Sequence, residues 1–347
     1  MMERPVVSRG RAGLRLCALG VLFAVAVMAG PASGTSTGEV GSGEDMALHL
    51  ATIARLASGE PFYVSVGEEL RNRRFPTASI FNWRTPALYQ FIALSPLTAR
   101  IVLGALAVVV LFATVKLLSP QPVTVVILGA ILQSGALGMA ADSTAWMFPE
   151  VWASVFIGLS TLAYASRHWT AGAILALTAL FIRELAAPYV ALCTVLALRG
   201  RRKPEVGTLM AGGVLYALYY GYHVSNVLAH QRPGDIAHAA SWIQWGGVEF
   251  ILATLRTSNL LNDMPVPVLA CALTLLAAGT LHEQLSLHLR GTVVVYMLLF
   301  AVVGQPFNWY WGWVPGLVVP TVMAHGPLVI QRLLLDAVGR QQAVEVP

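Results

Sequence analysis

The sequence contains few charged residues. Asp, Glu, Lys and Arg make up 11% of its 347 residues, whereas soluble domains average about 25%. Hydrophobic residues make up 56%, and the mean hydropathy is +0.68. A chain this apolar has too few polar side chains to cover the surface of a water-soluble globule. We therefore expect a multispanning membrane protein.

Several functional classes are excluded by what else is missing. The three cysteines, Cys17, Cys193 and Cys271, lie inside apolar runs and indicate no disulfide framework. There is no Walker A sequence, GxGxxG or GxSxG, and "HEQLSLH" at 282–288 is not the HExxH of zinc proteases. No basic block alternates with aromatic residues, so nucleic acid is not expected as a partner.

Apolar segments long enough to cross a membrane, about 20 residues each, recur along the chain. They are 14–32, 97–118, 122–140, 150–166, 206–224, 264–281, 291–305 and 313–330. The stretch 170–199 is interrupted by Arg183 and Glu184, which predicts two short helices meeting at that pair. We expect an all-α, polytopic fold with about ten transmembrane or half-membrane helices, forming a single transmembrane domain over residues 1–347.

Basic residues suggest the topology, because Lys and Arg concentrate in short cytoplasmic loops. This arrangement places the four arginines of the first fifteen residues and the run "RGRRK" at 199–203 inside. The first segment resembles a signal peptide, but an uncleaved helix is favoured because more spans follow. We expect a multi-pass inner (plasma) membrane protein with cytoplasmic termini and two long extracytoplasmic loops, 33–96 and 225–262.

The first long loop begins with two acids, Glu44 and Asp45, followed by an amphipathic helical pattern over 46–57 that a Gly/Pro break ends. Acids in a first helical turn stabilise the helix by roughly 0.3–1 kcal/mol. Alternatively, Asp45 shares a helix face with His49 and, beside apolar surface, has a raised pKa and acts as a general base. The residues alone leave both explanations open.

The same loop is rich in arginine, against the charge rule: it contains Arg55, Arg71, Arg73, Arg74 and Arg84. Guanidinium groups match phosphate geometry with paired hydrogen bonds, so a bound anion is one explanation. Pairing with the glutamates of the loop is the other, and it is slightly favoured by the sequence.

Two further segments hold polar groups among apolar residues. Arg183 and Glu184 each cost about 2.5–3.5 kcal/mol inside a membrane and usually mark a cavity, which we favour over a structural ion pair. The segment "FNWYWGW" at 307–313 surrounds Asn308 with aromatics, including Tyr310 and Trp311. A belt at the membrane interface explains it best, and a stacking surface for a sugar or lipid is the alternative.

Three stretches together resemble a known family. They are the acid, helix and Gly–Tyr close from Asp45 to Tyr63, the run "MFPEVWASVFIGLSTLAYASRHWTAGAILALTALFIRE" at 147–184, and "FNWYWGWVPGLVVP" at 307–320. They resemble the GT-C superfamily of integral membrane glycosyltransferases, which use polyprenyl-phosphate sugars on the outer face of the membrane. The likeness is greatest to the bacterial mannosyltransferase-like members and covers most of the chain.

The resemblance implies a transfer of a sugar, such as mannose, to a hydroxyl of a lipid, glycan or protein acceptor with inversion. Asp45 is implied as the base; the Glu44-Asp45 order, where many members have Asp-Glu or DxD, leaves Glu44 as the other candidate and the need for a divalent metal open. Residues implied to bind the donor phosphate are Arg183, Arg84, Arg73 and Arg74. Acceptor ligands or a second acid are implied at Glu150, Asp142 and Glu184.

Three rival functions remain open, and one of them is a structural or assembly subunit without catalysis. A transporter or flippase for a lipid-linked sugar predicts internal repeats and charges near the bilayer midplane, and no repeat is evident. A glycan polymerase or ligase predicts a large loop between late spans, whereas here the larger loop comes first.

Overall fold

The computed structural model describes residues 9–31, 42–237, 243–257, 260–304 and 306–339. Within these ranges every regular element is a helix, and strand pairing is limited to one isolated bridge between Ile243 and Val303. The predicted all-α class is confirmed.

The helices of the first half, with their bounds, are α1 (Arg9–Ala29), α2 (Ser42–Ala57), α3 (Phe62–Asn72), η2 (Ile80–Asn82), α4 (Pro86–Leu94), α5 (Pro96–Leu118), α6 (Val123–Ala141), η3 (Ala145–Met147) and α7 (Pro149–Ala165). Those of the second half are α8 (Trp169–Ile182), η4 (Glu184–Ala186), α9 (Ala187–Arg199), α10 (Lys203–His230), α11 (Gly247–Leu255), α12 (Val266–Thr280), α13 (Leu287–Val302), η5 (Pro306–Trp313), α14 (Val319–Met323) and α15 (Gly326–Val338).

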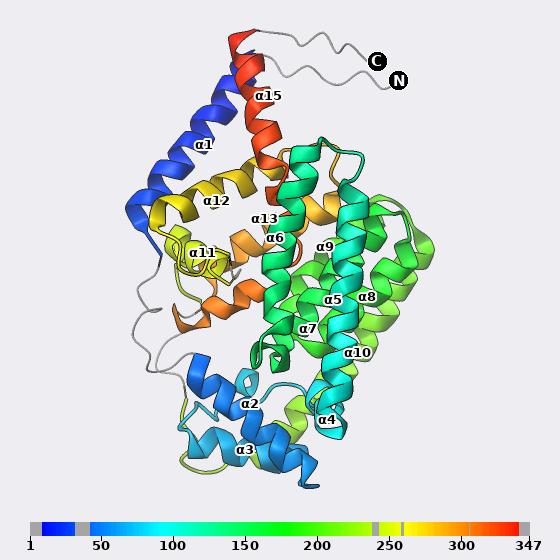
Figure 1. The fold of residues 1–347 in the computed structure, drawn as a ribbon. Coiled ribbons are helices and arrows are strands. Elements are labelled where there is room, and N and C mark those ends of the chain that lie inside the picture. The colour runs from blue at the N-terminus through cyan, green and yellow to red at the C-terminus, as the bar shows by residue number, and fades with distance from the viewer. Residues whose placement is uncertain (1–8, 32–41, 238–242, 258–259, 305, 340–347) are drawn as a thin grey trace.

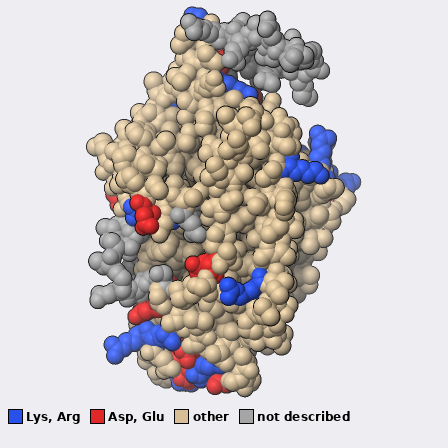
Figure 2. Space-filling model, viewed as in Figure 1, with Lys and Arg blue, Asp and Glu red and all other residues tan. Residues whose placement is uncertain are grey.

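Helices α1, α5 and α6 are each long and apolar enough to cross a membrane, and α8, α12 and α13 are shorter apolar helices. The space-filling view is mostly tan, and blue and red residues gather at its lower end (Figure 2). The chain is therefore a helical membrane protein.

Most predicted spans coincide with a helix, and the predicted break at Arg183 separates α8 from α9. The continuous span predicted over 313–330 is wrong. That segment comprises the end of η5, the short α14 and the start of α15. Pro315, Pro320 and Pro327 interrupt it, because proline lacks the amide hydrogen and its ring clashes with the preceding helical turn.

The two long loops are more helical than the sequence suggested. The first contains α2, α3 and α4, and α2 ends at the predicted Gly/Pro break, where Gly59 has φ +92°. The second is shortened because α10 continues to His230, and it includes α11. Much of the segment 30–43 lies outside the described residues.

Helices α2 and α3 form a cap across one end of the molecule, at the bottom of Figure 1. The start of α1 and the end of α15 lie together at the opposite end, and α1 packs on α12 and α15. Its buried residues, Ala12, Leu19 and Ala26, recur every seven positions and so form one stripe.

Candidate functional site

A cavity of about 410 Å³ lies between the cap and the bundle of apolar helices. Its walls come from α2, from the segment joining α3 to α4, from the break between α8 and α9, and from the segment running from the end of α13 into η5. Most of the lining surface is apolar, with a small group of charged side chains, a composition typical of ligand sites.

Asp45 lines this cavity from the first turn of α2, whereas Glu44 is exposed and is not among the lining residues. Burial raises the pKa of the Asp45 carboxyl to about 6; Arg84 opposes this rise and Glu150 adds to it. A carboxylate with a pKa near 6 is still mostly ionised at pH 7 and is a stronger base than an ordinary aspartate. Of the two acids, Asp45 is therefore the one placed to exchange a proton with a ligand in the cavity.

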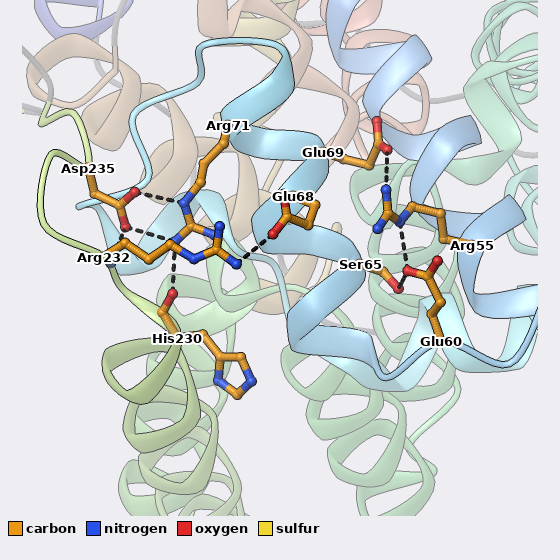
Figure 3. Close-up of polar contacts among 9 residues, drawn as sticks. All are labelled: Arg55, Glu60, Ser65, Glu68, Glu69, Arg71, His230, Arg232 and Asp235. Carbon is orange, nitrogen blue, oxygen red and sulfur yellow. Dashed lines mark hydrogen bonds and ion pairs between the residues drawn. The ribbon is translucent and has the colours of Figure 1, made fainter.

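Three of the five loop arginines pair with acids, and Figure 3 shows two of them, Arg55 and Arg71. The Arg55 Nε lies 2.8 Å from Glu60 and its Nη1 lies 3.2 Å from Glu69. The Arg73 Nε lies 3.3 Å from the second oxygen of Glu69.

Arg71 joins the cap to the chain beyond α10. It donates to both carboxylate oxygens of Asp235, at 2.9 and 3.0 Å, and to the carbonyl of His230 at 2.8 Å (Figure 3). Next to it, Arg232 donates to Glu68 at 2.5 Å. We call these four side chains and the His230 carbonyl the loop clamp; pairing explains the arginines here without any bound anion.

The two remaining loop arginines, Arg74 and Arg84, both line the cavity. Neither makes an ion pair with another described residue. The Arg84 guanidinium donates to the Phe81 carbonyl at 2.6 Å and to the Tyr310 hydroxyl at 3.4 Å. Of the two explanations that the sequence left open, pairing with acids applies to three of the loop arginines. The other two remain available to an anionic ligand.

Arg74 and Arg84 both have left-handed backbones, with φ of 58° and 47°. This region costs a non-glycine residue roughly 1–2 kcal/mol. Arg74 follows the C-cap of α3, and the Phe75 amide bonds back to the Leu70 carbonyl at 2.8 Å, which is the helix ending where glycine is preferred. An arginine at this position lowers the stability of the fold and places a cation in the cavity wall.

Neighbouring contacts fix the position of Arg84. The indole of Trp83 is fully buried and donates to the Thr77 carbonyl at 2.9 Å. The Thr85 hydroxyl donates toward the Ile182 carbonyl, at 3.3 Å, and so caps the end of α8. Arg84 is held between these two anchors, beside the break that carries Arg183.

Arg183 is 2% exposed and lies between two carboxylates. Its Nε donates to Glu150 Oε1 at 2.8 Å, and its Nη1 donates to Glu184. Both Arg183 and Glu184 line the cavity, but Glu150 is fully buried beneath them. Arg183 therefore both lines a cavity and forms a structural ion pair, the two alternatives that the sequence left open.

Several predicted site residues lie away from the cavity lining. Arg73 pairs with Glu69, as above, and Asp142 is exposed in the turn after α6, where its carboxylate accepts the Thr144 and Ala145 amides. His49 is buried, hydrogen-bonds Tyr89 and packs against Phe148. Burial lowers the pKa of His49 to about 3, with Arg84 also lowering it, so its imidazole is neutral.

The aromatic segment contributes directly to the wall. Asn308, Tyr310 and Trp311 line the cavity from η5. Asn308 is 2% exposed, and its Oδ1 has no hydrogen-bond partner among the described residues. A buried amide oxygen beside a cavity is suited to accept a hydrogen bond from a ligand hydroxyl.

Sequence inspection missed one part of the wall, the segment that contains Phe75, Phe81 and Asn82. Its side chains reach the cavity because Asn82 donates to the Pro76 carbonyl at 2.8 Å and folds the segment on itself. No periodic pattern marks such a fold. The arginines on either side of the segment were the available signal.

The described residues include no group of three or more His, Cys, Asp or Glu side chains placed to hold a metal ion.

Comparisons with protein-family models, with curated proteins and with solved structures found no match.

Proposed function

We propose that the protein is a membrane glycosyltransferase that moves a sugar from a polyprenyl-phosphate donor to an acceptor hydroxyl on the extracytoplasmic face, at the cavity beneath the cap. One observation carries the proposal: Asp45, a base with a raised pKa, shares a largely apolar cavity with Arg74, Arg84 and Arg183. A base and several cations in one cavity suit a reaction that removes a proton and releases a phosphate.

In the proposed step, the Asp45 carboxylate takes the proton of the acceptor hydroxyl. The acceptor oxygen forms a bond to the anomeric carbon at the same time. The bond from that carbon to the phosphate oxygen breaks, and the electron pair leaves with the polyprenyl phosphate. Attack from the face opposite the phosphate inverts the anomeric configuration.

The three arginines have different roles in this proposal. Arg74 and Arg84, which have no carboxylate partner among the described residues, are the donors best suited to the departing phosphate. Arg183 is already neutralised by Glu150 and Glu184, so its main part is to hold the break between α8 and α9 in place. Asn308 and Glu184 are candidates to bind sugar hydroxyls.

The leaving group distinguishes this proposal from its rivals. Purified protein in lipid vesicles would be given polyprenyl-phosphate mannose with a membrane extract as acceptor source, and the released lipid would be identified by mass spectrometry. A glycosyltransferase of this kind releases polyprenyl monophosphate. In a parallel reaction supplied with a polyprenyl-pyrophosphate-linked oligosaccharide, release of polyprenyl pyrophosphate would indicate a polymerase or ligase. Passage of intact donor across the bilayer without release would indicate a flippase; either result refutes the proposal.

Two adjacent arginines provide a matched pair of variants for this assay. Arg74→Gln removes a cation from the cavity wall, whereas Arg73→Gln removes one outside it. We expect a raised KM for the donor only in Arg74→Gln. Equal effects of the two changes would contradict the assigned phosphate site.

A further inference from the structure

A second charged hollow lies far from the first, where the start of α8 meets the turn between α9 and α10. Its volume is also about 410 Å³, and Trp169, Thr170, Arg201, Arg202, Lys203 and Glu205 contribute to its lining. Nothing in the proposed transfer reaction uses these residues.

The hollow lies at the opposite ends of α8 and α10 from the first cavity. Trp169 is the first residue of α8, and the Arg183 break follows the last residue of that helix. Lys203 is the first residue of α10, and the last residue of that helix, His230, belongs to the loop clamp. Twenty-eight helical residues extend α10 over roughly 42 Å, at about 1.5 Å each. This length exceeds the hydrocarbon thickness of about 30 Å, so the two hollows are far enough apart to lie at opposite membrane surfaces.

One cation in the hollow is held rigidly. The Arg202 guanidinium lies 4.2 Å from the centre of the Trp169 ring and also pairs with Glu205, which is 1% exposed. Gly200 leaves room for this arrangement, since a Cβ there would collide with the Arg202 side chain. Arg202 and Glu205 both line the hollow, and as an ion pair they add no net charge to it.

Two other cations carry the net charge. Arg201 and Lys203 are exposed, and neither makes an ion pair within the described part of the chain. Thr170 also lines the hollow and offers a hydroxyl donor. Paired cations, a hydroxyl and an indole at a membrane surface are complementary to a phosphate group at headgroup depth.

We propose that this hollow binds the headgroup of an anionic membrane phospholipid, with Arg201 and Lys203 on its phosphate and Trp169 beside its glycerol and first chain carbons. This inference is independent of the proposed transfer reaction. A free soluble phosphate offers the same charge, and the experiment below separates the two.

The backbone at Arg201 allows a clean test. Its φ is 52°, and the Arg202 amide bonds back to the Ala197 carbonyl, which is a helix ending that favours glycine. Arg167, after α7, has φ 62° and the same kind of ending, but does not line the hollow. Arg201→Gly and Arg167→Gly therefore remove the same charge and relieve the same backbone strain.

The test measures lipid binding to the full-length protein in detergent by native mass spectrometry, with phosphatidylglycerol and phosphatidylcholine of equal chain length. We expect tighter binding of phosphatidylglycerol, and a loss of roughly fivefold in its affinity for each cation removed. Arg201→Gly combined with Lys203→Gln should thus lose roughly 25-fold. Arg167→Gly should bind as wild type, and thermal melting should show both glycine variants folded.

Three results would overturn the proposal. Equal binding of the two lipids in wild type would remove the anionic preference. Equal losses in Arg167→Gly and Arg201→Gly would reduce the effect to general surface charge. Displacement of phosphatidylglycerol by millimolar inorganic phosphate would make the hollow a site for a soluble anion.

Discussion

Replacing Asp45 with asparagine tests stability and catalysis together. Burial raises the pKa of this carboxyl from 3.8 to about 6. One pKa unit corresponds to 1.36 kcal/mol, so the ionised side chain destabilises the folded protein by up to about 3 kcal/mol. Asparagine has nearly the same shape and carries no charge, and we expect Asp45→Asn to be more stable than wild type at pH 8.

The sign of the pH dependence follows from the raised pKa. Above about pH 6 the carboxyl is charged in both the folded and unfolded states, and the full cost of burial is present. As the pH falls through 6 the folded protein takes up a proton, and the cost shrinks to below about 1 kcal/mol near pH 4. The stability advantage of Asp45→Asn should shrink in parallel, which thermal melting in detergent at pH 4 and pH 8 would measure.

The same variant should lose transfer. Without a base, the rate of polyprenyl-phosphate release should fall by about 100-fold or more. The wild-type kcat/KM should fall about tenfold per pH unit below pH 6, as the base is protonated. A variant that releases polyprenyl phosphate at near the wild-type rate, or that is less stable than wild type at pH 8, would refute the assignment of Asp45.

Three further changes test other parts of the structure. Arg74→Gly should stabilise the fold by about 1 kcal/mol, because the left-handed backbone suits glycine, yet it should weaken donor binding. We expect a higher melting temperature together with a higher KM for the donor. A lower melting temperature would contradict the backbone strain assigned to Arg74. Arg183→Ala should destabilise by about 3–5 kcal/mol by leaving Glu150 buried and unpaired, and Arg183→Met with Glu150→Gln should recover the melting temperature but not wild-type transfer. The Arg71 guanidinium lowers the pKa of Asp235 to about 2, so the stability from this pair should be present above pH 4 and lost as the pH falls toward 2. Arg71→Met should abolish this acid transition in melting curves, and an unchanged transition would exclude the pair as its cause.

Local patterns in the sequence predicted the helices well. Apolar runs of sufficient length located the main spans, and a charged pair in an apolar run located the break at Arg183. The amphipathic helix after Glu44 and Asp45 was also predicted, because its period and its Gly/Pro end are local signals. Helix ends marked by arginine instead of glycine, as after α3 and α9, were invisible to the same inspection.

The site was predictable only in part, since its contacts join distant segments. Arg71 meets Asp235 across more than 160 positions, so no spacing rule could separate the paired arginines from those that line the cavity. The burial of Glu150 could not be predicted for the same reason. The sequence shows an acid at the start of a span, but the contact of Glu150 with Arg183 depends on how α7 packs on α8.

Because of the loop clamp, the cap and the helix bundle on either side of the cavity are held by different kinds of contact. The bundle is held by apolar contacts that added salt does not weaken. The cap reaches the α10 end through ion pairs as well as apolar contacts, and these pairs include the exposed Arg232–Glu68. Such pairs weaken with ionic strength. Rising salinity should therefore loosen the cap and widen the access to Asp45 while the apolar helices remain folded, and amide hydrogen exchange in α3 would accelerate ahead of that in α5.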